Sequence, residues 1–163
     1  MKELKEQKEK REIEQRKIYE NGKLKYVIIP NYTKSDFFMS SNEIRFYKFL
    51  INVIIEIKEQ YGENYDIFPQ VAINRIIKQN NRREKELEKE LFAKSIDFVI
   101  YDRKTENIVC CIELDGIEHQ IDKKRQERDI VINDMFESAA IKLIRQPVQE
   151  MYNTDIMIKK IMK

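Results

Sequence analysis

Apolar residues recur at helical spacing in the segment that follows Ser40-Ser41-Asn42. Serine and asparagine are favoured helix N-cap residues, and the apolar stripe behind them predicts a helix with one face directed at a core. The stripe consists of Phe46, Tyr47, Leu50, Ile51 and Ile54. Glu43 comes one helical turn before Phe46 and Tyr47, so it lies on the same face at the first turn. A buried carboxylate there requires a partner, whereas the simpler interpretation is that Glu43 favours the positive end of the helix dipole.

Two later runs have the pattern of paired strands. Residues 95–101 and 108–114 are rich in β-branched and aromatic residues, and the polar segment 102–107 separates them. We therefore expect an antiparallel hairpin. An earlier strand is expected over 66–71, where Pro69 indicates an edge or bulged position before a short helix.

The remaining segments complete an alternation of helices and strands. Residues 2–20 are almost wholly charged, which indicates a solvated helix or a mobile arm; an arm that touches DNA is the alternative. We divide the chain into this arm, residues 1–24, and a domain over residues 25–163. The order helix, strand, helix, hairpin, helix, strand, helix predicts an α/β fold, a central mixed β-sheet flanked by α-helices. The other expected elements are an exposed loop or helix extension over 80–90, a helix over 122–140, a strand over 141–145 ended by Pro147, and a last helix capped by Thr154 that carries Ile156, Ile161 and Met162.

Composition narrows the class of protein. A chain of 163 residues with 42% hydrophobic residues is long enough for one globular domain with a real core. The net charge of +2 requires any nucleic-acid-binding surface to be local. Cys110 and Cys111 are adjacent on a strand and so point to opposite faces, which fits two free thiols in a reducing compartment. The charged N-terminus and the absence of a run of roughly 18 apolar residues predict a cytoplasmic protein without a membrane span.

The hairpin brings carboxylates together. Side chains alternate along a strand, so Asp97 shares a face with Val99, and Glu113 shares a face with Asp115. If the turn centres on Thr105, Asp97 faces Glu113 directly, with Cβ atoms about 4.5–5.5 Å apart. A register slip of one residue removes this pairing.

Two carboxylates at that separation repel each other and need a shared proton, a basic partner or a divalent cation. Hard oxygen ligands suit Mg²⁺ or Mn²⁺. The alternative is a pair of exposed acids at the strand ends, which the surrounding apolar residues disfavour. We therefore expect a metal site at Asp97 and Glu113.

Further polar residues follow the hairpin. His119, the only histidine, is a candidate for proton transfer or for support of the acidic cluster, although a lone histidine is more often structural. One histidine and no spaced thiols exclude a zinc site of the usual kind. With three glycines and no phosphate-cradling loop, a nucleotide-hydrolysing enzyme is disfavoured.

Basic residues open the next helix. Lys123, Lys124, Arg125 and Arg128 can hold a phosphate backbone near the acidic residues, and a solvated helix face is an interpretation of equal weight. Arg128 and Asp129 precede an apolar stripe, so this part of the helix is also expected to face inwards.

Taken in order, these features resemble the PD-(D/E)XK nuclease superfamily, the restriction-endonuclease-like fold, and within it a bacterial branch of uncharacterised domains related to very-short-patch repair endonucleases. The resembling segments are Ser41-Asn-Glu43-x-x-Phe-Tyr47, Ile67-Phe-Pro-Gln-Val71, Ile96-Asp-Phe-Val-Ile100, Ile112-Glu-Leu-Asp-Gly116 with His119, Arg128-Asp129, and Ile141-x-Leu-Ile-Arg145. They span about residues 25–160.

The resemblance implies a mixed sheet flanked by helices, with Glu43, Asp97 and Glu113 as metal ligands and Gln70 and His119 as supporting groups. Asp115 stands where the superfamily pattern usually has lysine, although the branch commonly shows Glu-x-Asp. An aspartate cannot position water or stabilise developing charge as lysine does, so it could instead bind the metal and leave the cationic role to the basic residues of the next helix.

We hypothesise an Mg²⁺-dependent (or Mn²⁺-dependent) endonuclease that hydrolyses DNA phosphodiester bonds, with RNA as an alternative substrate and the oligomeric state, a homodimer included, left open. The rival hypothesis is a non-catalytic DNA-binding or protein-interaction module on the same fold. A coiled-coil docking arm at the N-terminus is a weaker third interpretation, because apolar heptads are missing there.

Overall fold

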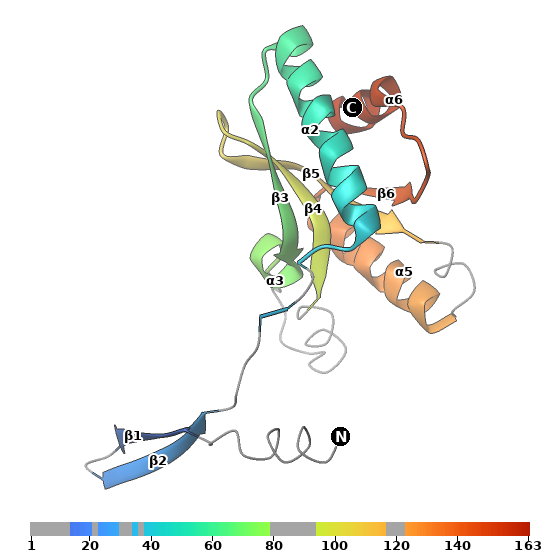
Figure 1. Ribbon diagram of the computed structural model, residues 1–163. Coiled ribbons are helices and arrows are strands. Elements are labelled where there is room, and N and C mark those ends of the chain that lie inside the picture. Colours follow the sequence, from blue (N-terminus) through green and yellow to red (C-terminus); the bar gives the residue numbers. More distant parts are fainter. Residues whose placement is uncertain (1–13, 21–22, 30–33, 36–37, 79–93, 117–122) are drawn as a thin grey trace, which may run out of the picture. The chain divides into compact units, whose positions relative to one another are not determined.

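The computed structural model describes residues 14–20, 23–29, 34–35, 38–78, 94–116 and 123–163 (Figure 1). The chain divides into two compact units, Met1–Phe38 and Met39–Lys163, which are described separately.

The first unit contains an antiparallel hairpin of β1 (Glu14–Glu20) and β2 (Lys23–Ile29), in which Ile18 pairs with Lys25. The expectation of a helix over residues 2–20 is therefore wrong for residues 14–20, which form β1. The sequence between the strands is Asn21-Gly22, a dipeptide preferred in two-residue hairpin connections. A charged segment without an apolar helix face gains backbone hydrogen bonds by pairing with a neighbouring strand. Because β1 pairs with β2, the predicted boundary between residues 24 and 25 falls within a single hairpin.

The second unit is an α/β structure with one mixed four-stranded sheet. Its strands lie in the order β3-β4-β5-β6, and every neighbouring pair is antiparallel except β5 and β6, which are parallel. This arrangement confirms the predicted element order and the edge position expected for the strand that contains Pro69. The elements are α2 (Ser41–Tyr61), β3 (Tyr65–Ala72), α3 (Ile73–Ile76), β4 (Ser95–Asp102), β5 (Asn107–Asp115), α5 (Lys123–Ser138), β6 (Leu143–Pro147) and α6 (Thr154–Met162).

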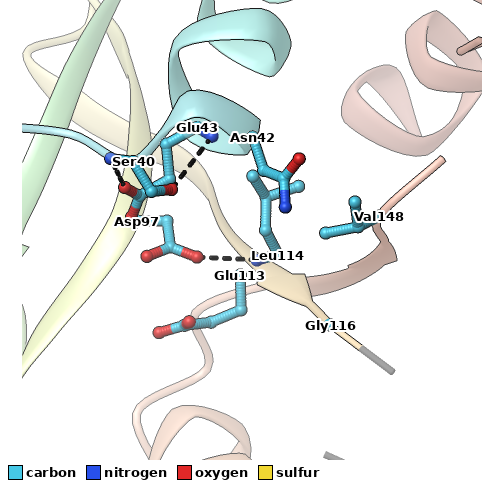
Figure 2. Close-up of a pocket in the computed structure, with 8 residues that line it drawn as sticks. All are labelled: Ser40, Asn42, Glu43, Asp97, Glu113, Leu114, Gly116 and Val148. Carbon is cyan, nitrogen blue, oxygen red and sulfur yellow. Dashed lines mark hydrogen bonds between the residues drawn. The ribbon is translucent and has the colours of Figure 1, made fainter. Parts of the chain in front are cut away.

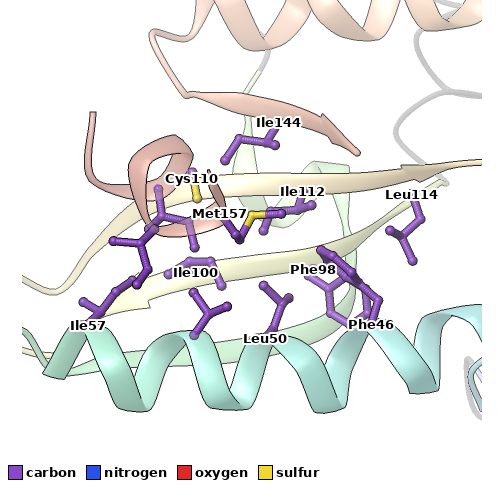
Figure 3. Close-up of a cluster of buried hydrophobic side chains, with 13 residues drawn as sticks. Phe46, Leu50, Ile57, Phe98, Ile100, Cys110, Ile112, Leu114, Ile144 and Met157 are labelled. Carbon is purple, nitrogen blue, oxygen red and sulfur yellow. The ribbon is translucent and has the colours of Figure 1, made fainter. Parts of the chain in front are cut away.

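Helices cover both faces of this sheet. Alternation along β4 places Phe98 and Ile100 in one core cluster with residues of α2 and α6, and Val99 in a second cluster with Ile132 and Phe136 of α5. Figure 3 shows the first cluster, in which the α2 side chains point at the strands. The sheet is therefore the rigid middle layer that carries the acidic residues.

Two helices differ in detail from the predictions, α2 in its buried face and α6 in its N-cap residue. In α2, Ile51 is exposed, whereas Val53 and Ile57 are fully buried, because the side chains that meet the sheet recur at alternating intervals of four and three residues. In α6 the N-cap is Asn153 rather than Thr154, since the Asn153 side chain accepts a hydrogen bond from the backbone of Ile156. None of the described helices is long and apolar enough to cross a membrane.

The β4–β5 hairpin contains a register shift that the sequence did not predict. Near the turn Tyr101 pairs with Ile108, whereas the next pair along the strands is Ile100 with Cys110, so Val109 is an extra residue in β5. Beyond this bulge Phe98 pairs with Ile112, which is the register that brings Asp97 opposite Glu113. The expected register is confirmed, but the bulge produces it, not a turn centred on Thr105.

Candidate active site

The N-terminus of α2 fixes Glu43. Ser40 is the N-cap, and its hydroxyl accepts a hydrogen bond of 3.3 Å from the backbone nitrogen of Glu43. In return, Oε2 of Glu43 accepts one of 2.5 Å from the backbone nitrogen of Ser40. This capping box satisfies two helix-terminal donors, so Glu43 has a structural role whatever else it does.

Gln70 connects Glu43 to the sheet. Its side-chain nitrogen donates to Oε1 of Glu43 at 2.6 Å and to Oδ1 of Asp97 at 3.5 Å, and its oxygen accepts from the Ser95 hydroxyl at 2.8 Å. The backbone of Gln70 is left-handed, with φ 53°, a conformation that costs a non-glycine residue about 1–3 kcal/mol. The surrounding contacts therefore hold Gln70 in a strained conformation beside both carboxylates.

Asp97 and Glu113 project from adjacent strands into one pocket of about 290 Å³ (Figure 2). Oδ2 of Asp97 accepts a hydrogen bond of 2.7 Å from the backbone nitrogen of Leu114, which anchors that carboxylate to β5. Three predicted ligands, Glu43, Asp97 and Glu113, thus line the same pocket. Its full lining is Ser40, Asn42, Glu43, Asp97, Glu113, Leu114, Gly116 and Val148.

Burial raises the pKa of both strand carboxylates. Burial is the largest effect on the pKa of Asp97, which rises to about 6. The hydrogen bond from Leu114 lowers this pKa, and the charge of Glu43 raises it. At Glu113 burial and then the charge of Asp97 raise the pKa to about 8, while the charge of Arg145 lowers it. The two carboxylates therefore disfavour simultaneous ionisation, as acids do when they share a site without a cation.

Asp115 is held by an ion pair beside the pocket, outside its lining. Nη1 of Arg145 lies 3.1 Å from Oδ1 of Asp115 and 3.2 Å from Oδ1 of Asp129, and its Nε donates to Asn133 at 3.2 Å. Asp115 is an anion paired with Arg145, so this position of β5 supplies no cation to the pocket. The neighbouring strand β6 brings a guanidinium instead.

Carboxylate oxygens are suitable ligands for Mg²⁺ or Mn²⁺, and their geometry fits such an ion in part. Asp97 and Glu113 converge, but both oxygens of Glu43 accept hydrogen bonds, from Ser40 and Gln70. Within the described ranges, no three carboxylate, imidazole or thiol groups are arranged to hold a metal ion as they stand. Asp97 and Glu113 would hold the ion directly, and Glu43 would join through water or after a side-chain rotation.

The remaining predicted site residues are divided between described and undescribed parts of the chain. His119 lies outside the described residues, as do the side chains of Lys123, Lys124 and Arg125 at the start of α5. Arg128 and Asp129 of α5 are half-buried, as the predicted inward face requires, and Asp129 contacts Arg145.

Sequence reasoning missed two residues that shape the site. Arg145 was assigned no role, although an arginine that ends an apolar strand is a signal of an internal charge partner; the partner depends on strand order, which periodicity does not reveal. Ser95 was also missed, because its contact with Gln70 depends on the pairing of β3 with β4.

Comparison with known proteins gives a family assignment without an activity. No curated protein and no solved structure matches the chain. A family model matches residues 36–163, which include all of the second compact unit. The chain therefore belongs to the family described as "Protein of unknown function (DUF2726)".

Proposed function

We propose that this protein is an Mg²⁺-dependent endonuclease that hydrolyses DNA phosphodiester bonds on a restriction-endonuclease-like fold. The observation that carries the proposal is the convergence of Asp97 and Glu113 in a pocket that Glu43 also lines. Buried carboxylates that repel each other are stabilised by a divalent cation, and sites of this kind are used for phosphoryl chemistry.

The chain's own groups have distinct roles in this proposal. Asp97 is anchored by the Leu114 backbone and Glu113 extends beside it, so both present oxygens to one position. Gln70 orients Glu43 and Asp97 through a single amide nitrogen. When bound there, Mg²⁺ supplies a water of lowered pKa and offsets negative charge on the phosphate.

The fold supports the same proposal. A helix that carries Glu43, a hairpin that carries Asp97 and Glu113, and a mixed sheet flanked by helices agree with the architecture that the superfamily resemblance implies. The buried free thiols Cys110 and Cys111 fit the cytoplasm as the place of action, because a reducing compartment keeps thiols free.

A plasmid-nicking assay with Mg²⁺ tests the activity. We expect the parent chain to convert supercoiled DNA to open circles, and Asp97→Asn and Glu113→Gln each to lower the rate by about 100-fold or more, because each removes a charged ligand. An RNA substrate in parallel distinguishes the two nucleic acids.

Matched controls separate this effect from a general loss of negative charge. Asp155→Asn and Glu59→Gln make the same chemical changes at exposed helix positions and should leave the rate unchanged. Equal cleavage by the parent and by both pocket variants would overturn the proposal.

A second function is a non-catalytic DNA-binding or protein-interaction module. The observation that favours it is the engagement of both Glu43 oxygens within the protein, which leaves two pocket carboxylates turned to a metal position. Calorimetry with Mn²⁺ distinguishes the two functions, since a module without a metal site takes up no Mn²⁺ while it still retains DNA.

A further inference from the structure

Arg145 lies beside the pocket because of the parallel pairing of β6 with β5. In that register Arg145 is the direct neighbour of Glu113, and neighbours in register project to the same face of a sheet. The guanidinium contacts Asp115 of β5 and Asp129 and Asn133 of α5, so one neighbouring strand and one helix fix its orientation. It is a charge held by three separate contacts from the rest of the fold.

The pocket and its surroundings carry an excess of acids. Glu43, Asp97 and Glu113 line the pocket, and the two aspartates bound to Arg145 lie next to it. A phosphodiester is an anion and is repelled by such a cluster, even when one divalent ion is bound. A fixed cation in the cluster reduces that repulsion.

We propose that Arg145 is a positioning residue that balances the acidic pocket, so that an anionic phosphodiester can approach the metal-binding carboxylates. This inference rests on the proposed function. The contacts of Arg145 with Asp115, Asp129 and Asn133 hold its charge on the strand position next to Glu113.

Arg145 acts without touching the substrate. It is absent from the pocket lining, and its side chain is 22% exposed. Its Nη2 is buried and has no hydrogen-bond partner among the described residues. An unmatched buried donor costs free energy, so burial of this charged group is not explained by its own hydrogen bonding.

Two binding constants measured on Arg145→Gln test this role. The neutral glutamine removes repulsion of a metal ion, so Mn²⁺ binding by calorimetry should tighten by roughly fivefold. Binding of a DNA duplex, measured by fluorescence anisotropy in Ca²⁺, should weaken by roughly tenfold, because Ca²⁺ takes the same carboxylate ligands while the phosphate meets a more negative cluster. If Arg145 had a purely structural role, the substitution would weaken the binding of both Mn²⁺ and DNA. That result would overturn the inference, and so would two unchanged binding constants.

A variant that restores the net charge distinguishes an effect of charge from misfolding of the single variant. Asp115→Asn combined with Arg145→Gln removes one negative and one positive charge, so the cluster keeps its net charge. We expect both constants to return to within about threefold of the parent values. If the double variant binds DNA as weakly as Arg145→Gln, charge balance is not the cause of the weaker DNA binding.

Arg103→Gln is the matched control. Arg103 forms an ion pair with Asp66, is 58% exposed and follows the end of β4 that lies away from Asp97, so both constants should be unchanged. Because the two constants require no turnover, a parent that binds metal and DNA but cleaves nothing overturns the proposed hydrolysis alone. A parent that takes up no Mn²⁺ overturns both proposals.

Discussion

The side-chain amide of Gln70 donates a hydrogen bond of 2.6 Å to Oε1 of Glu43. The same nitrogen lies 3.5 Å from Oδ1 of Asp97, so a neutral donor separates two carboxylates that would otherwise repel each other. The Ser95 hydroxyl donates to the amide oxygen and thereby sets which end of the amide faces the acids. The Gln70 amide in this way connects Glu43 of α2 to Asp97 of β4.

Gln70→Glu should destabilise the metal-free protein by about 1–3 kcal/mol, because a carboxylate replaces the donor and leaves three acids facing one another. Mn²⁺ should restore the loss, since the added oxygen ligand increases the affinity for a cation. Urea unfolding with and without Mn²⁺ measures both effects.

The control for this substitution is Gln149→Glu, the same change at an exposed position. Its free energy of unfolding should differ from that of the parent by no more than about 0.5 kcal/mol and should not respond to Mn²⁺. Equal losses in the two variants would show that the Gln70 amide does not separate the carboxylates.

The stability of the metal-free protein should fall as the pH rises. The folded-state pKa of Asp97, about 6, and that of Glu113, about 8, lie above the ordinary values of 3.8 and 4.5. The folded state therefore binds protons more tightly than the unfolded state. The stabilisation is complete below the ordinary values and is lost as the pH passes through about 6 and then about 8.

Urea unfolding at several pH values from about 5 to about 9, in the presence of a chelator, measures this dependence. Glu113→Gln should flatten the upper part of the curve, because the amide does not titrate. Mn²⁺ should reduce the loss at high pH by stabilising the ionised carboxylates. A chelated parent whose stability is constant over this range would contradict the raised pKa values.

Phe46 should be the most sensitive core position near the site. It is fully buried on α2, one turn after Glu43, with its ring centroid 5.6 Å from that of Phe98 and 4.8 Å from that of Tyr152. Phe46→Ala should lower the free energy of unfolding by about 3–5 kcal/mol, through lost burial and a cavity. Ile55→Ala, on the 49% exposed side of the same helix, should change it by no more than about 0.5 kcal/mol in the same denaturant titration.

Local pattern was sufficient to predict the hairpin and the start of α2. Alternation predicted that Asp97 and Glu113 share a face, and the residues Ser40 and Glu43 predicted a helix start that the structure realises as a capping box. These features depend on contacts between residues close in sequence. The Val109 bulge was not predicted, because the apolar run of β5 alternates just as well without it.

Where propensity is weak, local pattern misled. The charge of residues 14–20 indicated a helix or an arm, and the helix is wrong because these residues form β1, which pairs with β2. The exposure of Ile51 likewise depends on which side of α2 meets the sheet, and that side is set by packing rather than by the helix alone.

By itself the sequence determined that Asp97 and Glu113 lie on one face of a hairpin and that a separate helix carries Glu43 in its first turn, because backbone periodicity and capping are local properties. Only the tertiary structure decided that Gln70 reaches both Glu43 and Asp97, and that Arg145 lies beside Glu113. Those contacts join residues 27 and more positions apart in the chain, and they exist because strand order and hydrophobic packing bring distant segments into register.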